Sequence, residues 1–279
     1  GILVWADKDD KANIAEARTN NKPAVKLTQA KNNTYLSQGF KLTKDMDISV
    51  LCIGEYDEYV YDGGKIVDAD TREVKWKFKG SKAKHAGGAD KNRMINQDIH
   101  LEKGHYILYY STDDSHAYGS WNDAPPFAPE LYGISIWSKN KKDSKYITPY
   151  NADSYQGKMI ITGITAVGDH EHRTQTFTIE ESGAYRVYAI GEGDEDEMFD
   201  TGWIKNMDSG QIVWEFTYRK SSHAGGAKKN RMFNGNIYLQ KGTYKLYYET
   251  DGSHAFNDWN DTPPRDKENY GIQIRTLNQ

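Results

Sequence analysis

An internal repeat constrains the fold of this chain more than any other feature. Residues 85–137 and 223–275 align without a gap at an offset of 138, and 33 of the 53 aligned positions are identical. Gly54-Glu55 matches Gly191-Glu192 at an offset of 137, so one residue is gained in the loop that follows. A period this long corresponds to a whole domain rather than to one turn of a solenoid. The sequence therefore predicts two tandem copies of one fold.

Short alternating segments indicate that this fold is built from strands. Val74, Trp76 and Phe78 alternate with lysines, which is the period of two expected for a strand with one buried face. Each copy has about eight such segments and no convincing helix, which is typical of an antiparallel β-sandwich of jelly-roll-like type. We predict an all-β protein of two tandem duplicated antiparallel β-sandwich domains with a short N-terminal extension, with closed barrels as the alternative.

The strand candidates follow the same order in both copies. In the first copy they are 24–29, 36–42, 46–53, 60–68, 73–78, 92–101, 105–111 and 131–137. In the second copy they are 160–166, 174–179, 185–190, 199–206, 212–218, 232–239, 243–249 and 270–276. The positions that we expect to point into the cores include Val74, Trp76, Phe78, Tyr244, Leu246 and Tyr248.

Composition shifts suggest the domain boundaries. We expect an N-terminal extension at 1–21, a first sandwich at 22–138, a charged linker at 139–157 and a second sandwich at 158–279. The extension contains a short apolar run, Ile2–Trp5, which would be costly to leave exposed. We expect this run to dock as a strand on a sheet edge of its own chain or of a neighbour, which makes self-association a candidate function.

Charge and composition exclude several classes of partner. The net charge is −4, from 36 basic and 40 acidic residues, which is not the pattern of a nucleic-acid-binding protein. No apolar run approaches the roughly 20 residues of a membrane span. Cys52 is the single cysteine, so no intramolecular disulfide can form, and a small buried strand residue is the simplest interpretation of it.

Two polar loops recur in both copies and carry most of the candidate chemistry. The Trp-Asn-Asp loop spans 112–126 and 250–264, and the Gly-Gly loop spans 85–93 and 223–231. These loops enter and leave one antiparallel hairpin, so we expect them at the same end of each sandwich. The candidate ligand-binding residues are His85, Asn92, Arg93, Asp113, His116, Trp121, Asn122, Asp123, His223, Asn230, Arg231, Asp251, His254, Trp259, Asn260 and Asp261.

The same loops can be interpreted in two ways. As a site, they would bring His85 near His116 and Arg93 near Asp113 or Asp123, with Trp121 as a stacking platform. As a structural latch, they would form a closed polar network with the indole tucked beneath the loop. The sequence favours a latch for Trp121 and Asp123, and a site for His85, His116, His223 and His254.

A third loop is rich in carboxylates. It could hold a hard cation such as Ca²⁺, although its spacing is not that of an EF-hand and its length differs between the copies. A solvated hairpin tip is the alternative. The candidate ligands are Glu55, Asp57, Asp62, Glu192, Asp194, Asp196 and Asp200.

Two hairpins resemble a known kind of module. The segments 177–188 and 239–248, with Gly-containing turns between alternating strands, are similar to secreted bacterial β-sandwich accessory modules of the pre-peptidase C-terminal or carbohydrate-binding type. The resemblance implies a non-catalytic, exported accessory protein. We expect it outside the cell or in the periplasm, with no required cofactor and Ca²⁺ as a possible one.

Two functions follow as expectations. In the first, the chain is a binding or assembly protein whose ligand is a carbohydrate or a protein surface. In the second, it is a metal-assisted hydrolase that uses His85, His116 and Asp113, repeated in the second copy. Two copies of the same loops favour binding, because duplication serves avidity.

Overall fold

The computed structural model describes residues 22–152, 155 and 159–277. These residues divide into two compact units: the first comprises the described residues up to Tyr155 except Asp70–Arg72, and the second comprises Asp70–Arg72 and the described residues after Tyr155. The expected N-terminal extension at 1–21, with its docking strand Ile2–Trp5, lies outside the described residues.

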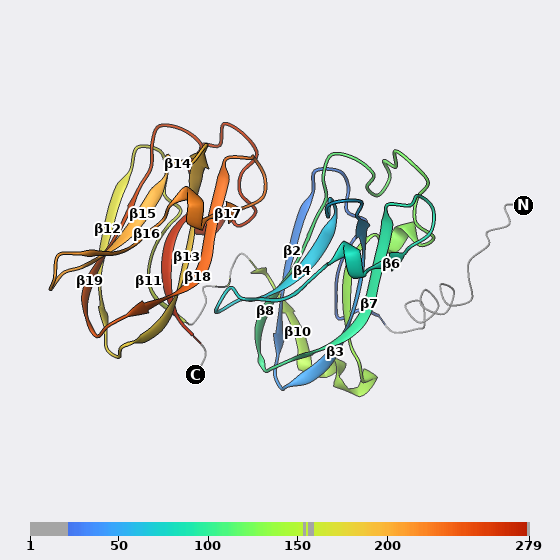
Figure 1. Ribbon diagram of the computed structural model, residues 1–279. Coiled ribbons are helices and arrows are strands. Elements are labelled where there is room, and N and C mark those ends of the chain that lie inside the picture. The colour runs from blue at the N-terminus through green and yellow to red at the C-terminus, as the bar shows by residue number, and fades with distance from the viewer. Residues whose placement is uncertain (1–21, 153–154, 156–158, 278–279) are drawn as a thin grey trace, which may run out of the picture. The chain divides into compact units, whose positions relative to one another are not determined.

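The first unit consists of two antiparallel sheets (Figure 1). One sheet has the order β1-β9-β3-β7-β6 and the other the order β10-β2-β8-β4-β5. The strands are β1 (Val25–Thr28), β2 (Tyr35–Leu42), β3 (Met46–Glu55), β4 (Gly63–Asp68), β5 (Val74–Lys77), β6 (Lys84–His85), β7 (Asn92–Leu101), β8 (Gly104–Ser111), β9 (Gly133–Ser138) and β10 (Ile147–Tyr150). The 3-10 helices η1 (Gly80–Lys82), η2 (Pro129–Leu131) and η3 (Lys141–Tyr146) lie between these strands.

The second unit has the same order of corresponding strands. Its sheets are β11-β20-β13-β18-β17, with β14 paired to β13, and β12-β19-β15-β16. The strands are β11 (Ile160–Thr165), β12 (His172–Ile179), β13 (Gly183–Asp194), β14 (Glu197–Met198), β15 (Thr201–Asn206), β16 (Ile212–Glu215), β17 (Ser222–His223), β18 (Asn230–Leu239), β19 (Gly242–Glu249) and β20 (Gly271–Thr276). The 3-10 helices η5 (Tyr218–Lys220) and η6 (Lys267–Asn269) belong to this unit.

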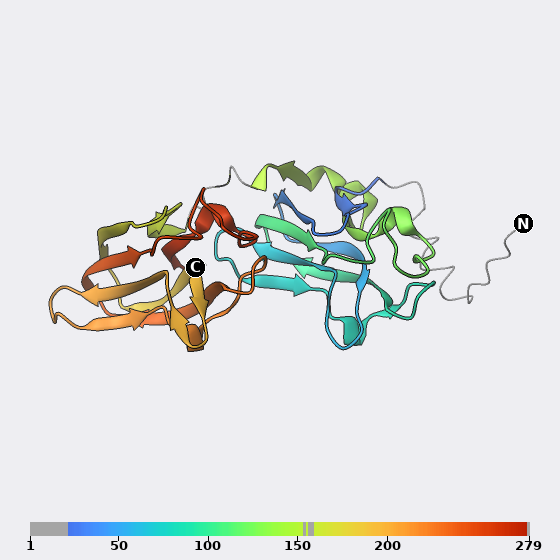
Figure 2. The same cartoon turned by 90° about the horizontal axis from the view of Figure 1, so that it is seen from above.

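The core of each unit lies between its two sheets, which Figure 2 shows as separate layers. Alternate residues of β3, such as Ile48, Val50 and Cys52, meet Phe40 and Leu108 from the opposite sheet. The sheets remain open at their edges, so the prediction of all-β sandwiches is confirmed and closed barrels are not what forms. None of the helices among the described residues is long and apolar enough to cross a membrane.

One of the expected core positions is wrong. Trp76, Phe78, Tyr244, Leu246 and Tyr248 are buried, whereas 45% of the surface of Val74 is exposed. The cause is a bulge, because Trp76 pairs with Ile66 while Val74 already pairs with the next residue, Val67. The extra residue between them breaks the period of two and turns Val74 to the outside.

The segment expected to be a linker carries regular structure. Residues 139–157 include η3 and β10, and β10 pairs with β2 from Ile147 opposite Leu42 to Tyr150 opposite Gly39. The charged residues of this segment lie in η3, where Asn140 accepts a hydrogen bond from the Lys142 amide as a cap. The stretch up to Tyr150 is therefore an edge of the first sandwich.

Candidate functional site

The three polar loops of the first unit meet at one end of the sandwich. The Tyr56 amide of the acidic loop donates to the Lys91 carbonyl, and the Ala89 amide of the Gly-Gly loop donates to the Ala124 carbonyl. The Asp113 amide of the Trp-Asn-Asp loop donates to Oδ1 of Asp62 at 2.8 Å. The hairpin topology predicted that the Gly-Gly and Trp-Asn-Asp loops lie at the same end, and in this unit they do.

His116 is the buried centre of this end. Its Nε2 lies 2.7 Å from Oδ1 of Asn92, and its Nδ1 lies 2.8 Å from Oδ1 of Asn122. Nδ2 of Asn92 donates to the Gly87 and Ala124 carbonyls, which settles which way this amide faces. Nε2 of His116 must therefore carry a proton and donate it to Asn92. The ring is thus fixed by its Nε2 bond and enclosed by the loops on both sides.

The second unit repeats this network around His254. Its Nε2 and Nδ1 lie 2.7 and 3.0 Å from Oδ1 of Asn230 and Asn260. Nδ2 of Asn230 donates to the Gly225 and Thr262 carbonyls. Burial, followed by the positive charge of a nearby lysine, lowers the pKa of both histidines. A fully enclosed ring with lowered basicity suits a latch rather than an exposed ligand-binding group.

The tryptophan of the same loop also packs inward. The Trp121 ring meets the His116 ring edge-on at 5.1 Å and the Tyr132 ring at 5.0 Å, and Trp259 repeats this with His254 and Tyr270. These half-buried indoles hold the loop down instead of offering a free stacking face.

The aspartate and asparagine next to the tryptophan have local partners. Oδ1 of Asp123 accepts from the Ala124 amide at 2.6 Å, and Asp261 accepts from the Thr262 amide in the same way. Asn122 and Asn260 accept from Lys91 and Lys229. Each of these bonds stays within the converged loops.

Two expected neighbourhoods do not form. Arg93 donates to the backbone carbonyls of Asp90 and Asn92 rather than to Asp113 or Asp123, so that part of the expectation is wrong. Nε2 of the exposed His85 lies 3.1 Å from the Ala89 carbonyl of its own loop instead of joining His116. In both cases the side chain finds its hydrogen-bond partner in a backbone carbonyl no more than four residues away in sequence.

Their second-unit counterparts are held locally too. Nε2 of His223 lies 3.0 Å from the Ala227 carbonyl. The Arg231 guanidinium lies 4.2 Å from the ring centre of Tyr218 and donates to Oγ of Ser221. Arg231 is thus stacked on a tyrosine rather than aimed at Asp251 or Asp261.

A cluster of three carboxylates forms where the acidic and Trp-Asn-Asp loops meet. Glu55, Asp62 and Asp113 each place one oxygen within 4.8 Å of the other two. Oε1 of Glu55 pairs with Lys91 at 2.8 Å, and Oε2 is buried without a hydrogen-bond partner. The Tyr132 hydroxyl donates to Oδ2 of Asp62 at 2.5 Å. Burial raises the pKa of Asp62 to about 7, against the lowering effect of this bond.

The second unit forms the same cluster from Glu192, Asp200 and Asp251. Lys229 pairs with Oε1 of Glu192 at 2.6 Å, and Oε2 of Glu192 is again buried without a partner. The Tyr270 hydroxyl donates to Asp200, whose pKa burial raises to about 7. We call the two clusters the carboxylate triads. Among the described residues, both groups with metal-ligand geometry are these triads, and neither contains a histidine.

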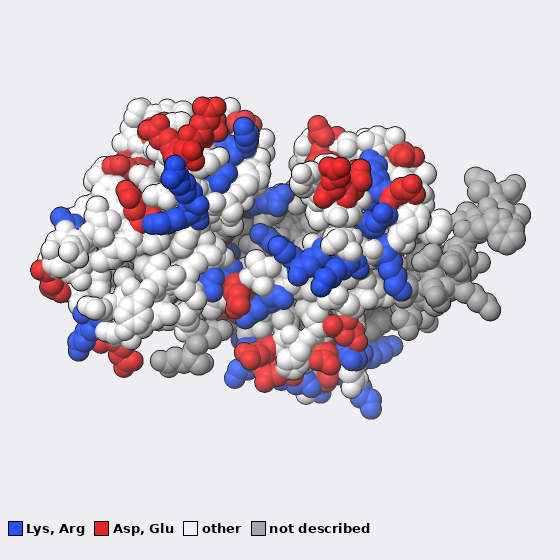
Figure 3. Space-filling model, in the orientation of Figure 1, with Lys and Arg blue, Asp and Glu red and all other residues white. Residues whose placement is uncertain are grey.

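The remaining acidic-loop residues lie outside the triads. Asp57 and Asp196 are exposed and Asp194 is half-buried, so these three have the character of a solvated hairpin tip. Figure 3 shows Asp and Glu side chains at the loop end of each unit, with Lys and Arg beside them.

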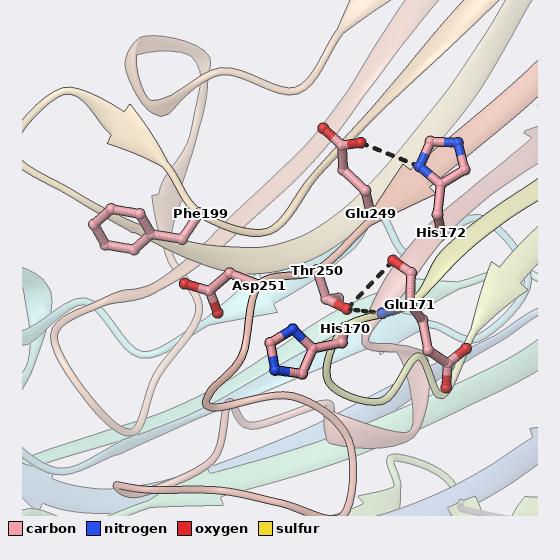
Figure 4. Close-up of a pocket in the computed structure, with 7 residues that line it drawn as sticks. All are labelled: His170, Glu171, His172, Phe199, Glu249, Thr250 and Asp251. Carbon is pink, nitrogen blue, oxygen red and sulfur yellow. Dashed lines mark hydrogen bonds and ion pairs between the residues drawn. The ribbon is translucent and has the colours of Figure 1, made fainter.

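The second unit also has a polar pocket that the sequence analysis missed (Figure 4). It has a volume of about 360 Å³ and is lined by His170, Glu171, His172, Phe199, Glu249, Thr250 and Asp251. Nδ1 of His172 lies 3.2 Å from Oε2 of Glu249, and 40% of the surface of Phe199 is exposed. The available signal was the run His170-Glu171-His172, which replaces Asn33-Thr34-Tyr35 of the first copy. The run is present in only one copy, so the internal repeat does not point to it.

An aromatic stack extends from this pocket along the outer face of the sheet. The rings of Trp203 and Tyr247 are parallel within 8° at 4.9 Å, and both side chains are half-buried. The His172 ring lies 6.2 Å from Trp203 and 6.4 Å from Tyr247, which links the stack to the pocket. In the first unit the position of Trp203 is occupied by Lys65, and Tyr109 at the position of Tyr247 is buried.

Fold and site together define an all-β protein of the antiparallel sandwich class, with a carboxylate triad at the loop end of each unit. Neither the family models nor the curated proteins compared with the sequence include a match.

Three solved structures are similar over most of the chain. The CUB1-EGF-CUB2 domain of human MASP-1/3 matches at 9% identity and a TM-score of 0.26, covering 91% of this chain and 98% of that one. PBCV-1 VP54, as fitted into a reconstruction of the virophage Sputnik, matches at 9% identity, a TM-score of 0.24 and coverages of 89% and 94%. The VP2 subviral particle of infectious bursal disease virus matches at 10% identity, a TM-score of 0.19 and coverages of 96% and 82%. At such TM-scores none of these similarities bears on function.

Proposed function

We propose that the chain is a non-catalytic binding protein whose second unit binds carbohydrate in the polar pocket and on the adjoining aromatic stack. The observation that carries the proposal is the continuity between the pocket and the parallel rings of Trp203 and Tyr247 through His172.

The groups present suit a sugar. The apolar C–H face of a pyranose packs on an aromatic ring, which Trp203, Tyr247 and the exposed Phe199 offer. Hydroxyl groups need convergent acceptors and donors, which Glu249, Asp251 and the histidines of the pocket supply. A polar pocket beside an aromatic surface therefore suits a sugar, which has both an apolar C–H face and many hydroxyl groups.

The hydrolase alternative lacks a comparable arrangement. Its three residues, His85, His116 and Asp113, would have to converge on one metal ion. Instead, His85 is bonded within its own loop, both ring nitrogens of His116 face asparagine oxygens, and Asp113 belongs to a triad of carboxylates. This geometry favours binding over metal-assisted hydrolysis.

The proposal extends to an extracellular or periplasmic location, where polysaccharide is accessible. It is supported by the resemblance of the hairpins 177–188 and 239–248 to exported accessory modules. Fractionation of the source cells tests it, and recovery of the chain in the cytosolic fraction would contradict it.

Association with a protein surface, including self-association through Ile2–Trp5, is a separate proposal that concerns residues outside those described. Light scattering on the chain with and without residues 1–21 tests it, with a lower mass expected after deletion. An unchanged mass would remove self-association from the proposed functions.

A glycan array followed by calorimetry tests carbohydrate binding. Trp203→Ala should weaken binding of the best glycan about two- to tenfold, because one aromatic contact contributes about 0.5–1.5 kcal/mol. Tyr238→Ala is the matched control, since Tyr238 is the most exposed large aromatic residue described in the second unit, at 68%, and lies on β18 in the other sheet. Absence of any glycan ligand, or equal effects of the two substitutions, would overturn the proposal.

A further inference from the structure

The carboxylate triads keep one geometry although the loops that build them differ in length. Asp62 follows Glu55 by seven positions, whereas Asp200 follows Glu192 by eight. In both units three carboxylate oxygens nevertheless lie within 4.8 Å of one another. The second unit absorbs its additional residue in the short pairing of β13 with β14, beyond Glu192. The arrangement of the three carboxylates is thus the same in both units, although the length of the loop differs.

A buried oxygen without a partner marks each triad. Glu55 and Glu192 are 4% and 3% exposed, and in each the Oε1 atom is paired with a lysine. Oε2 of each glutamate is buried and has no hydrogen-bond partner. A buried carboxylate oxygen is strongly destabilising unless something positive or a donor faces it. The same atom is left without a partner in two separate units, which indicates a ligand that both units are built to take.

The excess of negative charge at each triad also indicates that the ligand is a cation. Three carboxylates are met by one lysine, Lys91 in the first unit and Lys229 in the second. Asp62 and Asp200, the central aspartates, each accept hydrogen bonds from two neutral donors, a tyrosine hydroxyl and a backbone amide. Like charges at this separation repel strongly in a partly buried site. A divalent cation would remove this repulsion.

We propose that each carboxylate triad binds one hard divalent cation, Ca²⁺, so that the chain carries two calcium sites. The donors are oxygens only, which suits Ca²⁺ and not a metal that prefers nitrogen or sulfur. His116 and His254, the buried histidines at this end of the two sandwiches, are turned onto asparagines. Mg²⁺ usually keeps several waters and takes one or two carboxylates, so three converging carboxylates favour the larger ion.

The route to each site is open on one side. Glu55 and Asp62 are buried, while Asp113 is half-buried, and in the second unit Asp251 is exposed. An ion can therefore enter past the aspartate of the Trp-Asn-Asp loop, and water can complete its oxygen shell from that side. Bound Ca²⁺ would tie the acidic loop to the Trp-Asn-Asp loop in each unit.

Terbium luminescence and calcium calorimetry on the full chain test the proposal. Tb³⁺ replaces Ca²⁺ at oxygen sites and is sensitised by nearby aromatic rings, here Tyr132 and Tyr270, whose hydroxyls donate to the triads. We expect two Ca²⁺ per chain, one after Asp62→Asn, one after Asp200→Asn and none after both. Asparagine keeps an acceptor for the tyrosine hydroxyl, which limits the effect on folding.

Control variants distinguish binding at the triads from a general effect of removing negative charge. Asp57→Asn and Asp194→Asn remove the same charge from the same loops outside the triads, and should leave both sites and their affinities unchanged. If Asp62→Asn or Asp200→Asn fails to fold, Asp113→Asn and Asp251→Asn change the most accessible ligands instead. These should weaken binding at their own site at least tenfold.

Two results would overturn the proposal. The first is a folded wild-type chain that binds neither Ca²⁺ nor Tb³⁺ by either method. The second is binding that the triad variants and the control variants weaken equally, which would mean diffuse attraction to an acidic surface. Retention of Tb³⁺ against excess Mg²⁺, with release by Ca²⁺, is the expected selectivity, and displacement by Zn²⁺ alone would contradict it. Loss of glycan binding with both calcium sites intact would overturn only the carbohydrate proposal.

Discussion

The Nε2 proton of His116 has one acceptor, Oδ1 of Asn92, and that acceptor has no easy substitute. Asn92 is fully buried, and its amide hydrogens are already given to the Gly87 and Ala124 carbonyls. Removing the imidazole would therefore leave a buried oxygen without a donor and an unfilled space beside Trp121. The same reasoning applies to His254 and Asn230 in the second unit.

His116→Ala is therefore expected to destabilise the first unit by about 1–3 kcal/mol, the cost of an unsatisfied buried partner. Urea unfolding measures this cost. Asp123→Ala is the control, because this exposed side chain bonds only to the adjacent amide, and it should change stability by less than about 0.5 kcal/mol. Equal effects of the two substitutions would contradict a latch centred on the histidine.

Individual residue types could be predicted from the sequence, but their partners could not. Glu55 and Asp62 could be predicted as candidate cation ligands from the density of carboxylates in one loop. Asp113 completes their triad, and its backbone amide donates a hydrogen bond to Asp62 across 51 positions, which no local pattern encodes. Likewise, the choice between site and latch for His116 depended on where Asn92 and Asn122 lie in space.

At the scale of elements, strand periodicity predicted most of the sheets because one face of each strand is buried. Prediction failed where pairing is irregular or very short. The two-residue strands β6 and β17 have no periodicity to detect, and β10 contains a proline and lies at an edge, where one side of the strand needs no partner. The bulge in β5 is defined by the pairing with β4, so its effect on Val74 could not be predicted from β5 alone.

Because of this bulge, two apolar residues of the same segment differ sharply in their expected contribution to stability. Trp76 packs into the core of the first unit, whereas Val74 is turned outward. We expect Trp76→Ala to cost about 3–5 kcal/mol and Val74→Thr less than about 0.5 kcal/mol. Chemical denaturation of both variants measures the difference. A cost for Val74→Thr comparable with that of Trp76→Ala would mean that the register of β5 is not the one described.

At the scale of the molecule, the two units have separate cores. The single thiol, Cys52, lies in one of these cores, so its reactivity measures the opening of that unit alone. Cys52 is fully buried in the core of the first unit, and Ala189 occupies the matching place in the second. Burial raises the pKa of the Cys52 thiol far above its ordinary value, so the native thiol should be almost inert toward a disulfide reagent. Labelling then requires the first unit to open.

Trp76 and Trp214 occupy equivalent positions in the two units, 138 residues apart, and are 8% and 6% exposed. Trp76→Ala should accelerate the labelling of Cys52 on the order of a hundredfold or more, because about 3–5 kcal/mol of stability is lost from the unit that contains the thiol. Trp214→Ala removes an equivalent side chain from the other unit and should leave the labelling rate unchanged. Thiol labelling of the two variants under native conditions distinguishes the cases. If both substitutions accelerate labelling equally, the two units unfold as one, and the stability of each sandwich depends on the other.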